Sequence, residues 1–126
     1  MGYYSEVSLT LKKADALELI RKAKGDESDA QSLIAAADSI IDQDQYVTFY
    51  WNFVKWYDTF SSVQFITHFY HGVDEYSFKR VGEDSGDIEI DWGGDYSDIC
   101  ELSEVHQSID VLPGQPLYVN DIWEES

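Results

Sequence analysis

Cysteine, proline and basic residues are scarce in this sequence of 126 residues. The lone cysteine, Cys100, has no partner for a disulfide within the chain, which favours a reducing, intracellular compartment. No segment approaches the roughly 20 apolar residues that a membrane span requires. Residues 1–10 alternate polar and apolar side chains and lack the pattern of a signal peptide. We therefore expect a cytoplasmic protein that makes no membrane contact.

The shortage of basic residues leaves the chain strongly acidic. Eight Lys and Arg stand against 25 Asp and Glu, which gives a formal net charge of -17. All eight basic residues lie within residues 1–80, whereas residues 81–126 hold 13 acidic residues and no base. Such a surface repels nucleic acid and anionic membranes, and it attracts basic protein surfaces. Direct binding of nucleic acid is therefore excluded as an expected function.

Catalytic signatures are also missing. The sequence has no Gly-rich phosphate loop, no Gly-x-Ser-x-Gly and no His-Glu-x-x-His. Cys100 and His106 form a conceivable nucleophile and base, but an acidic surrounding disfavours the thiolate. His68 and His71 are three residues apart without a nearby cysteine or helical carboxylate at ligand spacing, and the acidic runs do not match a calcium-binding loop. We predict no catalytic residue, no metal and no cofactor.

Hydrophobic periodicity predicts a single α+β domain over residues 1–126, with a less regular C-terminal segment at 95–126. Ser28 and Gln31 have the spacing of a capping box at the start of a second helix. The predicted elements are strands at residues 3–11, 46–57, 76–81 and 87–92, and helices at 12–24, 28–42 and 61–72. This order indicates a mainly antiparallel sheet of about four strands, with two to three helices packed on one face.

An aromatic block lies within the second predicted strand. Its members are Tyr46, Tyr50, Trp51, Trp56 and Tyr57. The composition favours a strand buried on both faces, with one face formed by Val47, Phe49, Trp51 and Phe53. Core packing is the favoured role of the block. The alternative is an exposed face that docks another protein, because Tyr and Trp are enriched at interfaces.

Acidic residues at alternate positions mark the candidate partner-binding site. In a strand such residues lie about 6.6 Å apart on one face, whereas one strand of a DNA duplex carries a charge about every 3.4 Å. A nucleic-acid mimic therefore requires acids of the tail beside those of the hairpin. The candidates are Glu83, Asp84, Asp87, Glu89, Asp91, Trp92, Asp95, Asp98, Glu101 and Glu104. The alternative is a solvated acidic face that confers solubility.

Three segments resemble small uncharacterised acidic proteins of bacteriophages and prophages. They are MGYYSEV at residues 1–7, FYWNFVKWY at 49–57 and RVGED at 80–84, so that the resemblance covers residues 1–94. It implies a setting inside a bacterial host cell. In size and charge the chain is also similar to anti-CRISPR and anti-restriction inhibitors, which occupy nucleic-acid channels of host defence proteins.

Together these observations predict a non-enzymatic inhibitor that binds a basic, nucleic-acid-binding host defence protein and blocks its nucleic-acid site. The acidic residues would pair with Lys and Arg of the partner, while exposed aromatics such as Tyr50 or Trp92 add specificity. One alternative is an interaction or assembly protein that docks through the aromatic sheet face. A small metal-dependent hydrolase that uses the same acids is a third possibility.

Overall fold

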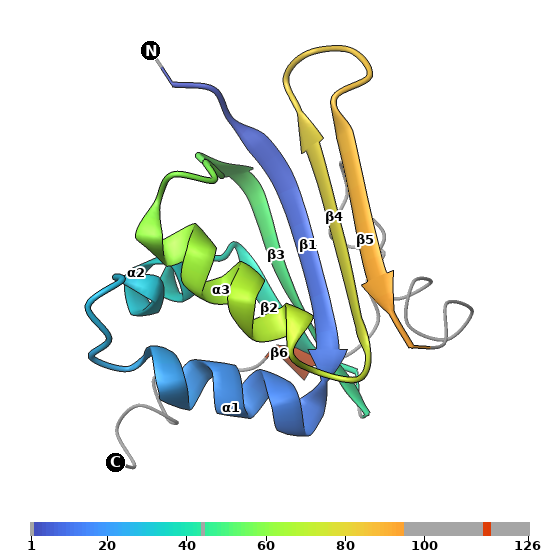
Figure 1. Ribbon diagram of the computed structural model, residues 1–126. Coiled ribbons are helices and arrows are strands. Elements are labelled where there is room, and N and C mark those ends of the chain that lie inside the picture. The colour runs from blue at the N-terminus through green and yellow to red at the C-terminus, as the bar shows by residue number, and fades with distance from the viewer. Residues whose placement is uncertain (1, 44, 95–114, 117–126) are drawn as a thin grey trace.

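The computed structural model describes residues 2–43, 45–94 and 115–116. Helices and strands combine in one α+β unit, in which a single antiparallel sheet carries the helices on one face (Figure 1). The strands are β1 (Ser5–Lys12), β2 (Ser39–Asp42), β3 (Tyr46–Val54), β4 (Tyr76–Gly82), β5 (Ile88–Gly93) and the two-residue β6 (Gln115–Pro116). The helices are α1 (Lys13–Ala23), α2 (Ala30–Ala35) and α3 (Ser61–His71).

The strand order is β5-β4-β1-β3-β2-β6. Five of these strands span four residues or more, so the predicted fold class is confirmed with more strands than the expected four. The first helix, the third helix and the hairpin also form where the sequence predicts them. β1 lies at the centre because both β3 and β4 pair with it. The long antiparallel partners thereby enclose β1 on both edges.

The core forms where β1 meets the helices. Val7, Leu9 and Leu11 alternate along β1 and are fully buried. Leu19 of α1 and Ile66 of α3 cover this row on the helical side of the sheet. Burying an aliphatic side chain of this size stabilises the fold by about 1.5–3 kcal/mol. The period of two in the first strand is therefore what fixes the position of the helices over the sheet.

Two members of the aromatic block belong to the same core. Trp51 and Trp56 are buried, with ring centroids 5.1 Å apart, and the indole N–H of Trp51 donates to the carbonyl oxygen of Leu33 at 2.9 Å. Tyr50 is only 2% exposed, so its predicted role as an exposed anchor is wrong. Thr48 and Tyr50 lie on the other face of the strand from Trp51 and are also buried, which confirms that this strand is buried on both faces.

Phe53 departs from the predicted face of β3. The pairing of β1 with β3 shifts register between Ser5 and Val7, so an extra residue of β3 opposes β1 at that point. Such an irregularity reverses the side-chain alternation that follows it. Phe53 is consequently exposed, and its ring stacks on Tyr4 with centroids 3.9 Å apart.

The second predicted helix is wrong over its second half. α2 ends at Ala35, and Ser39–Asp42 forms β2, which pairs antiparallel with β3 so that Ile40 lies opposite Phe49. Pairing with β3 satisfies backbone groups of a short segment that contains two consecutive isoleucines, which favour strands. Non-local pairing therefore prevails over the local helical spacing.

The predicted capping box also fails to form. The side-chain oxygen of Ser28 accepts from the N–H of Ala30 at 3.2 Å, and that of Gln31 accepts from the N–H of Gly25 at 3.1 Å. The N-cap of α2 is instead Asp29, in the left-handed conformation at φ 66°. Its carboxylate accepts from the Ser32 hydroxyl at 2.7 Å. The two polar side chains thus stabilise the preceding turn.

Candidate functional site on the β4–β5 hairpin

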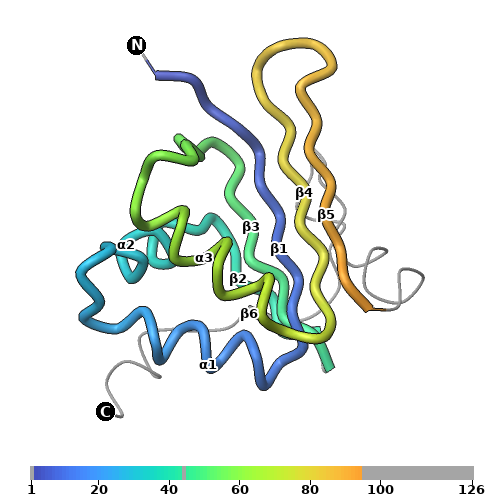
Figure 2. Tube along the Cα trace, viewed as in Figure 1, coloured from blue at the N-terminus to red at the C-terminus, as the bar shows by residue number. Residues whose placement is uncertain are grey.

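The β4–β5 hairpin stands apart from the helical layer. The tube in Figure 2 shows its turn projecting beyond α3, on the side of the molecule where the N-terminal segment enters β1. The two strands pair without a register shift, from Val81 opposite Ile88 to Tyr76 opposite Gly93. Gly86 in the turn has a φ of 83°, a conformation that favours glycine. The predicted hairpin with a glycine-containing loop is therefore confirmed.

Alternation along β5 separates acidic from apolar side chains. Asp91 lies opposite Phe78, which belongs to the core beneath the helices, so the side chains of this parity face the helical side. We call Asp87, Glu89 and Asp91 the acidic row. The reverse side carries the apolar row of Ile88, Ile90 and Trp92, which are 60%, 55% and 45% exposed.

Arg80 neutralises much of the acidic row. Its guanidinium binds both carboxylate oxygens of Asp87, at 2.8 and 3.2 Å, and donates from Nε to Glu89 at 3.0 Å. A further hydrogen bond at 3.1 Å joins it to the Ser5 hydroxyl on β1. The carboxylates raise the pKa of Arg80 further above its ordinary value, and the guanidinium lowers the pKa of Asp87. Asp87 is therefore a structural carboxylate bound to β4, and Arg80 extends this contact to β1 through Ser5.

The N-terminal segment binds the turn of the hairpin. The hydroxyl of Tyr3 donates to Asp87 at 2.5 Å and accepts from the backbone N–H of Asp84 at 2.9 Å. The hydrogen bond to Asp87 raises the pKa of Tyr3. The backbone N–H of Tyr4 donates to Glu83 at 2.5 Å. Glu83 and Asp87 are thus held by local contacts, while the exposed carboxylate of Asp84 binds no other side chain among the described residues.

Asp91 connects the far end of β5 to α3. Its carboxylate lies 2.8 Å from Nε2 of His71, the last residue of that helix, and accepts from the hydroxyl of Tyr76 at 3.2 Å. Burial, followed by the charge of Asp91, raises the pKa of Tyr76. Asp91 therefore fixes the position of the hairpin against the helical layer.

The structure brings together six of the ten candidate residues. Glu83, Asp84, Asp87, Glu89, Asp91 and Trp92 belong to the hairpin. Asp95, Asp98, Glu101 and Glu104 lie outside the described residues, as do Cys100 and His106. Sequence reasoning missed Tyr3, His71 and Arg80 as partners of the acidic row. Counting outward from the predicted strand ends at residues 81 and 87 places Arg80 opposite Ile88, whereas the observed pairing of Val81 with Ile88 places it opposite Glu89.

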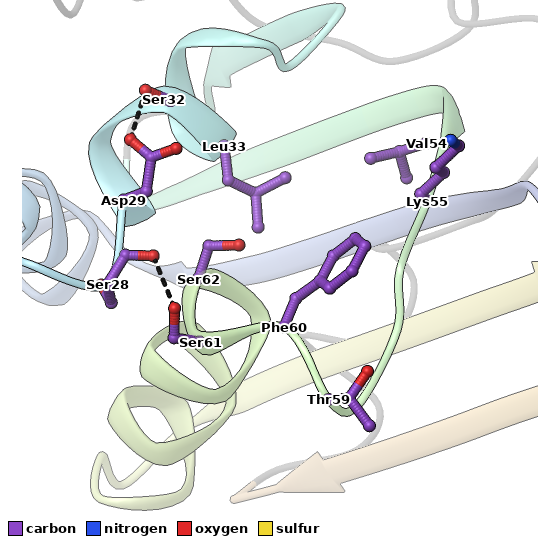
Figure 3. A pocket seen from close by; sticks show the side chains of 10 residues that line it. All are labelled: Ser28, Asp29, Ser32, Leu33, Val54, Lys55, Thr59, Phe60, Ser61 and Ser62. Carbon is purple, nitrogen blue, oxygen red and sulfur yellow. Dashed lines mark hydrogen bonds between the residues drawn. The ribbon is translucent and has the colours of Figure 1, made fainter. Parts of the chain in front are cut away.

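Described residues on the helical side of the molecule line two of its hollows. The larger, of about 620 Å³, opens between the starts of α2 and α3 and the end of β3, and Figure 3 shows Leu33 and Phe60 extending toward its interior. Its described lining is rich in hydroxyl groups and includes two ionisable side chains, Asp29 and Lys55, and the Asp29 carboxylate already accepts a hydrogen bond from Ser32. The hydroxyl of Ser61 is already bound to the carbonyl of Ser28 at 3.1 Å. The smaller hollow, of about 300 Å³, includes His68 and His71.

Neither hollow contains the donor set of a metal site. Among the residues that the structure describes, no three His, Cys, Asp or Glu side chains converge on one point. The same described part of the chain includes no helix with the length and apolar character needed to cross a membrane. Comparison of the chain with protein-family models, curated proteins and solved structures finds no match in any of the three.

Proposed function

We propose that this chain is a non-enzymatic binding protein that recognises a basic, nucleic-acid-binding protein through the β4–β5 hairpin and competes with its nucleic acid. The observation that carries the proposal is the pairing of an acidic row with an exposed apolar row on one projecting hairpin. In the setting implied by the phage resemblance, the partner is a host defence protein in the bacterial cytoplasm.

Charge supports a cationic partner even after the internal ion pairs are counted. Residues 76–93 contain five acidic residues and two basic ones, so five minus two leaves a net charge of -3. Glu89 uses one oxygen for Arg80 and remains half exposed, and the exposed Asp84 carboxylate is available as well. These two groups can accept hydrogen bonds from Lys or Arg of a partner, which would otherwise contact phosphate.

The apolar row supports a protein partner rather than a small cation. Single exposed apolar residues are ordinary on protein surfaces, but Ile88 and Ile90 are adjacent on one strand face. Covering such a row removes apolar area from water and supplies the short-range part of the affinity. Long-range attraction and short-range contact thus come from the two faces of the same strand.

A salt-graded capture experiment tests the proposal. The protein is immobilised, exposed to bacterial lysate, and washed at rising ionic strength before the bound proteins are identified and challenged with duplex DNA. Asp84→Asn/Glu89→Gln should release the captured basic protein at lower salt, and DNA should displace it. Glu18→Gln/Glu27→Gln removes the same charge from exposed positions elsewhere and serves as the control.

The same variants separate the proposal from a second candidate. In that candidate the apolar row makes the contact and the acids only keep the chain soluble, which the exposure of Ile88 and Ile90 also favours. Capture that is insensitive to salt and to Asp84→Asn/Glu89→Gln, but lost on changing Ile90, would establish the second candidate. Equal weakening by both charge variants would show that net charge alone acts, and the hairpin would lose its proposed role.

A further inference from the structure

Phe53 projects from the end of β3 on the reverse side of the sheet. Val54 pairs with Ser5 and packs against the core, so the neighbouring Phe53 lies on the face that also carries the apolar row. Its ring is 68% exposed, more than any other large apolar side chain that the structure describes. The register irregularity between β1 and β3 turns it outward, and such irregularities commonly redirect a side chain beside a functional site.

The Phe53 ring belongs to a stacked aromatic pair with Tyr4. The two rings are inclined by 11°, and their centroids are 3.9 Å apart. Nζ of Lys55 lies 5.6 Å from the centroid of the Tyr4 ring, within the range of a cation–π contact. The pair thus already attracts one cation of the chain itself, while the Phe53 ring is largely open to solvent.

Carboxylates lie beside both rings of this pair. Glu83 of the hairpin turn accepts from the backbone N–H of Tyr4 at 2.5 Å. Asp38 accepts from the backbone N–H of Asn52, the residue before Phe53, at 2.6 Å. Each carboxylate uses one oxygen in this way and is exposed, so its second oxygen can accept hydrogen bonds from a partner.

The hairpin turn and the aromatic pair lie at the same end of the sheet. Ser5 of β1 pairs with Val54 on one side and with Gly82 on the other, so the ends of β3 and β4 flank the start of β1 (Figure 1). Neighbouring strands lie about 4.8 Å apart, which separates these two ends by about 10 Å. One partner surface can therefore contact both.

We infer that the exposed face of Phe53 binds the guanidinium of an arginine in the nucleic-acid site of the partner. The inference rests on the proposed function and specifies which basic side chain is recognised. A guanidinium is planar and weakly hydrated, so it stacks on an aromatic ring while its N–H groups donate to carboxylates; an ammonium is a compact, strongly hydrated charge. Asp38 and Glu83 supply the acceptors beside the pair.

Charge argues against the other groups that stack on an exposed ring. A nucleic-acid base brings phosphates with it, which a net charge of -17 repels. A second copy of the chain carries the same net charge, and stacking of its Phe53 would bring like carboxylates together. An arginine instead brings a charge complementary to Asp38 and Glu83.

Two peptides of equal charge test the inference on the full chain at low ionic strength. Hexa-arginine and hexa-lysine, both with blocked ends, are titrated into the protein, and binding is measured by calorimetry. Phe53→Leu keeps an apolar side chain and the net charge but removes the aromatic ring. Phe60→Leu is the matched control, because Phe60 is also exposed but its ring contacts Tyr57 instead of Tyr4.

Phe53→Leu should weaken the binding of hexa-arginine about twofold to fivefold, as expected for an exposed cation–π contact, and leave that of hexa-lysine unchanged. Phe60→Leu should alter neither. On the unmodified protein, nuclear Overhauser effects should connect arginine side-chain protons with the ring of Phe53. Circular dichroism checks that both variants are folded, and the Overhauser measurement is decisive even if Phe53→Leu does not fold.

Equal weakening of both peptides by Phe53→Leu would overturn guanidinium stacking. Unchanged binding of hexa-arginine, an equal loss in Phe60→Leu, or the absence of the Overhauser contacts would overturn it as well. In each of these results the proposed recognition of a basic protein would stand, because basic peptides still bind. A failure of both peptides to bind at low salt would instead remove the proposed function along with the inference. A concentration-dependent dimer that Phe53→Leu abolishes would assign the ring to a second copy and also overturn the inference.

Discussion

Replacement of Arg80 by methionine is the most direct test of the hairpin as described. Methionine keeps an unbranched apolar stem but removes the guanidinium, and with it the hydrogen bonds to Asp87, Glu89 and Ser5. The change leaves the acidic row without its main counter-charge. It should destabilise the native state without altering the packing of the core.

The expected loss lies between two limits. Hydrogen bonds to charged groups contribute about 1.5–3 kcal/mol when they are shielded from water, whereas exposed ion pairs contribute about 0.2–1 kcal/mol. The side chain of Arg80 is 16% exposed, but that of Glu89 is 52% exposed. We therefore expect Arg80→Met to lower the free energy of unfolding by about 2 kcal/mol, and the urea midpoint by roughly 1 M. Arg80→Lys keeps the positive charge but lacks the planar guanidinium, so its free energy of unfolding should lie between those of the wild type and Arg80→Met.

Unfolding at low pH tests whether the ion pair between Arg80 and Asp87 causes this loss of stability. The pKa of Asp87 is lowered in the folded protein, so between that value and the unfolded value of about 3.9 the unfolded chain binds more protons. The stabilisation is thus complete above about pH 4 and is lost as the pH falls through the folded pKa. Urea unfolding measured from pH 7 downward should show the difference between wild type and Arg80→Met narrowing below pH 4. A difference that is absent at pH 7, or that is unchanged at pH 3, would refute the ion-pair explanation.

Three further outcomes concern groups in the sheet. Thr48→Val should lower the free energy of unfolding by about 1–3 kcal/mol, because it leaves the buried hydroxyl of Thr10 without its partner at 2.7 Å. Urea unfolding should show that the double variant with Thr10→Val loses less stability than the sum of the two single variants. Burial and a nearby carboxylate raise the pKa of Tyr50, so an ultraviolet titration should show a phenol that stays neutral above pH 10. Its stabilisation is complete below the unfolded pKa of about 10 and is lost as the pH rises from there through the folded pKa. Trp51→Phe removes one of the two donors to the Leu33 carbonyl, which keeps the N–H of Ala36 at 3.2 Å, and should cost about 0.5–1.5 kcal/mol beyond the loss of ring contacts, as measured by denaturation; a cost near zero would show that the hydrogen bond does not stabilise the fold.

Local patterns were sufficient for the elements whose pairing is also local. The hairpin follows from two alternating runs that flank a glycine-containing turn, and its strands are neighbours in the sheet. The first and third helices are bounded by signals within their own segments. For each of these elements the local preference and the tertiary structure agree, which is the condition under which sequence patterns are reliable guides.

The errors occur where a distant strand determines the local structure. Ile40 and Ile41 have helical spacing relative to Leu33 and Ile34, yet they belong to a strand because β3 provides an antiparallel partner for them. The register irregularity beside Ser5 likewise depends on how β1 and β3 meet, and it exposes Phe53. Neither the partner strand nor the irregularity has a signature within the segment that it alters.

The candidate site shows a similar division. Alternation along residues 87–92 was sufficient to place the acidic row on one face and Trp92 on the other. Whether other side chains neutralise the acidic row does not follow from residues 87–92 alone, because it depends on which residues lie beside the row in the fold. Tyr3 and His71 reach the hairpin from opposite ends of the fold, and only the tertiary structure identifies them. Arg80 belongs to the hairpin itself, but its place opposite Glu89 depends on the observed register, which pairs Val81 with Ile88.

This internal neutralisation changes how the hairpin would recognise a partner. Carboxylates already bound to Arg80 and His71 gain less from a new cation than free ones would, because part of their hydrogen-bonding capacity is occupied. The net charge of the whole chain still attracts a basic protein over about a Debye length, roughly 8 Å at physiological salt. Charge would therefore accelerate association, while the remaining carboxylate oxygens of Asp84 and Glu89, together with the apolar row, would govern dissociation. Added salt should then slow association and also shorten the lifetime of the complex, and Asp84→Asn/Glu89→Gln should reduce the effect of salt on both rate constants.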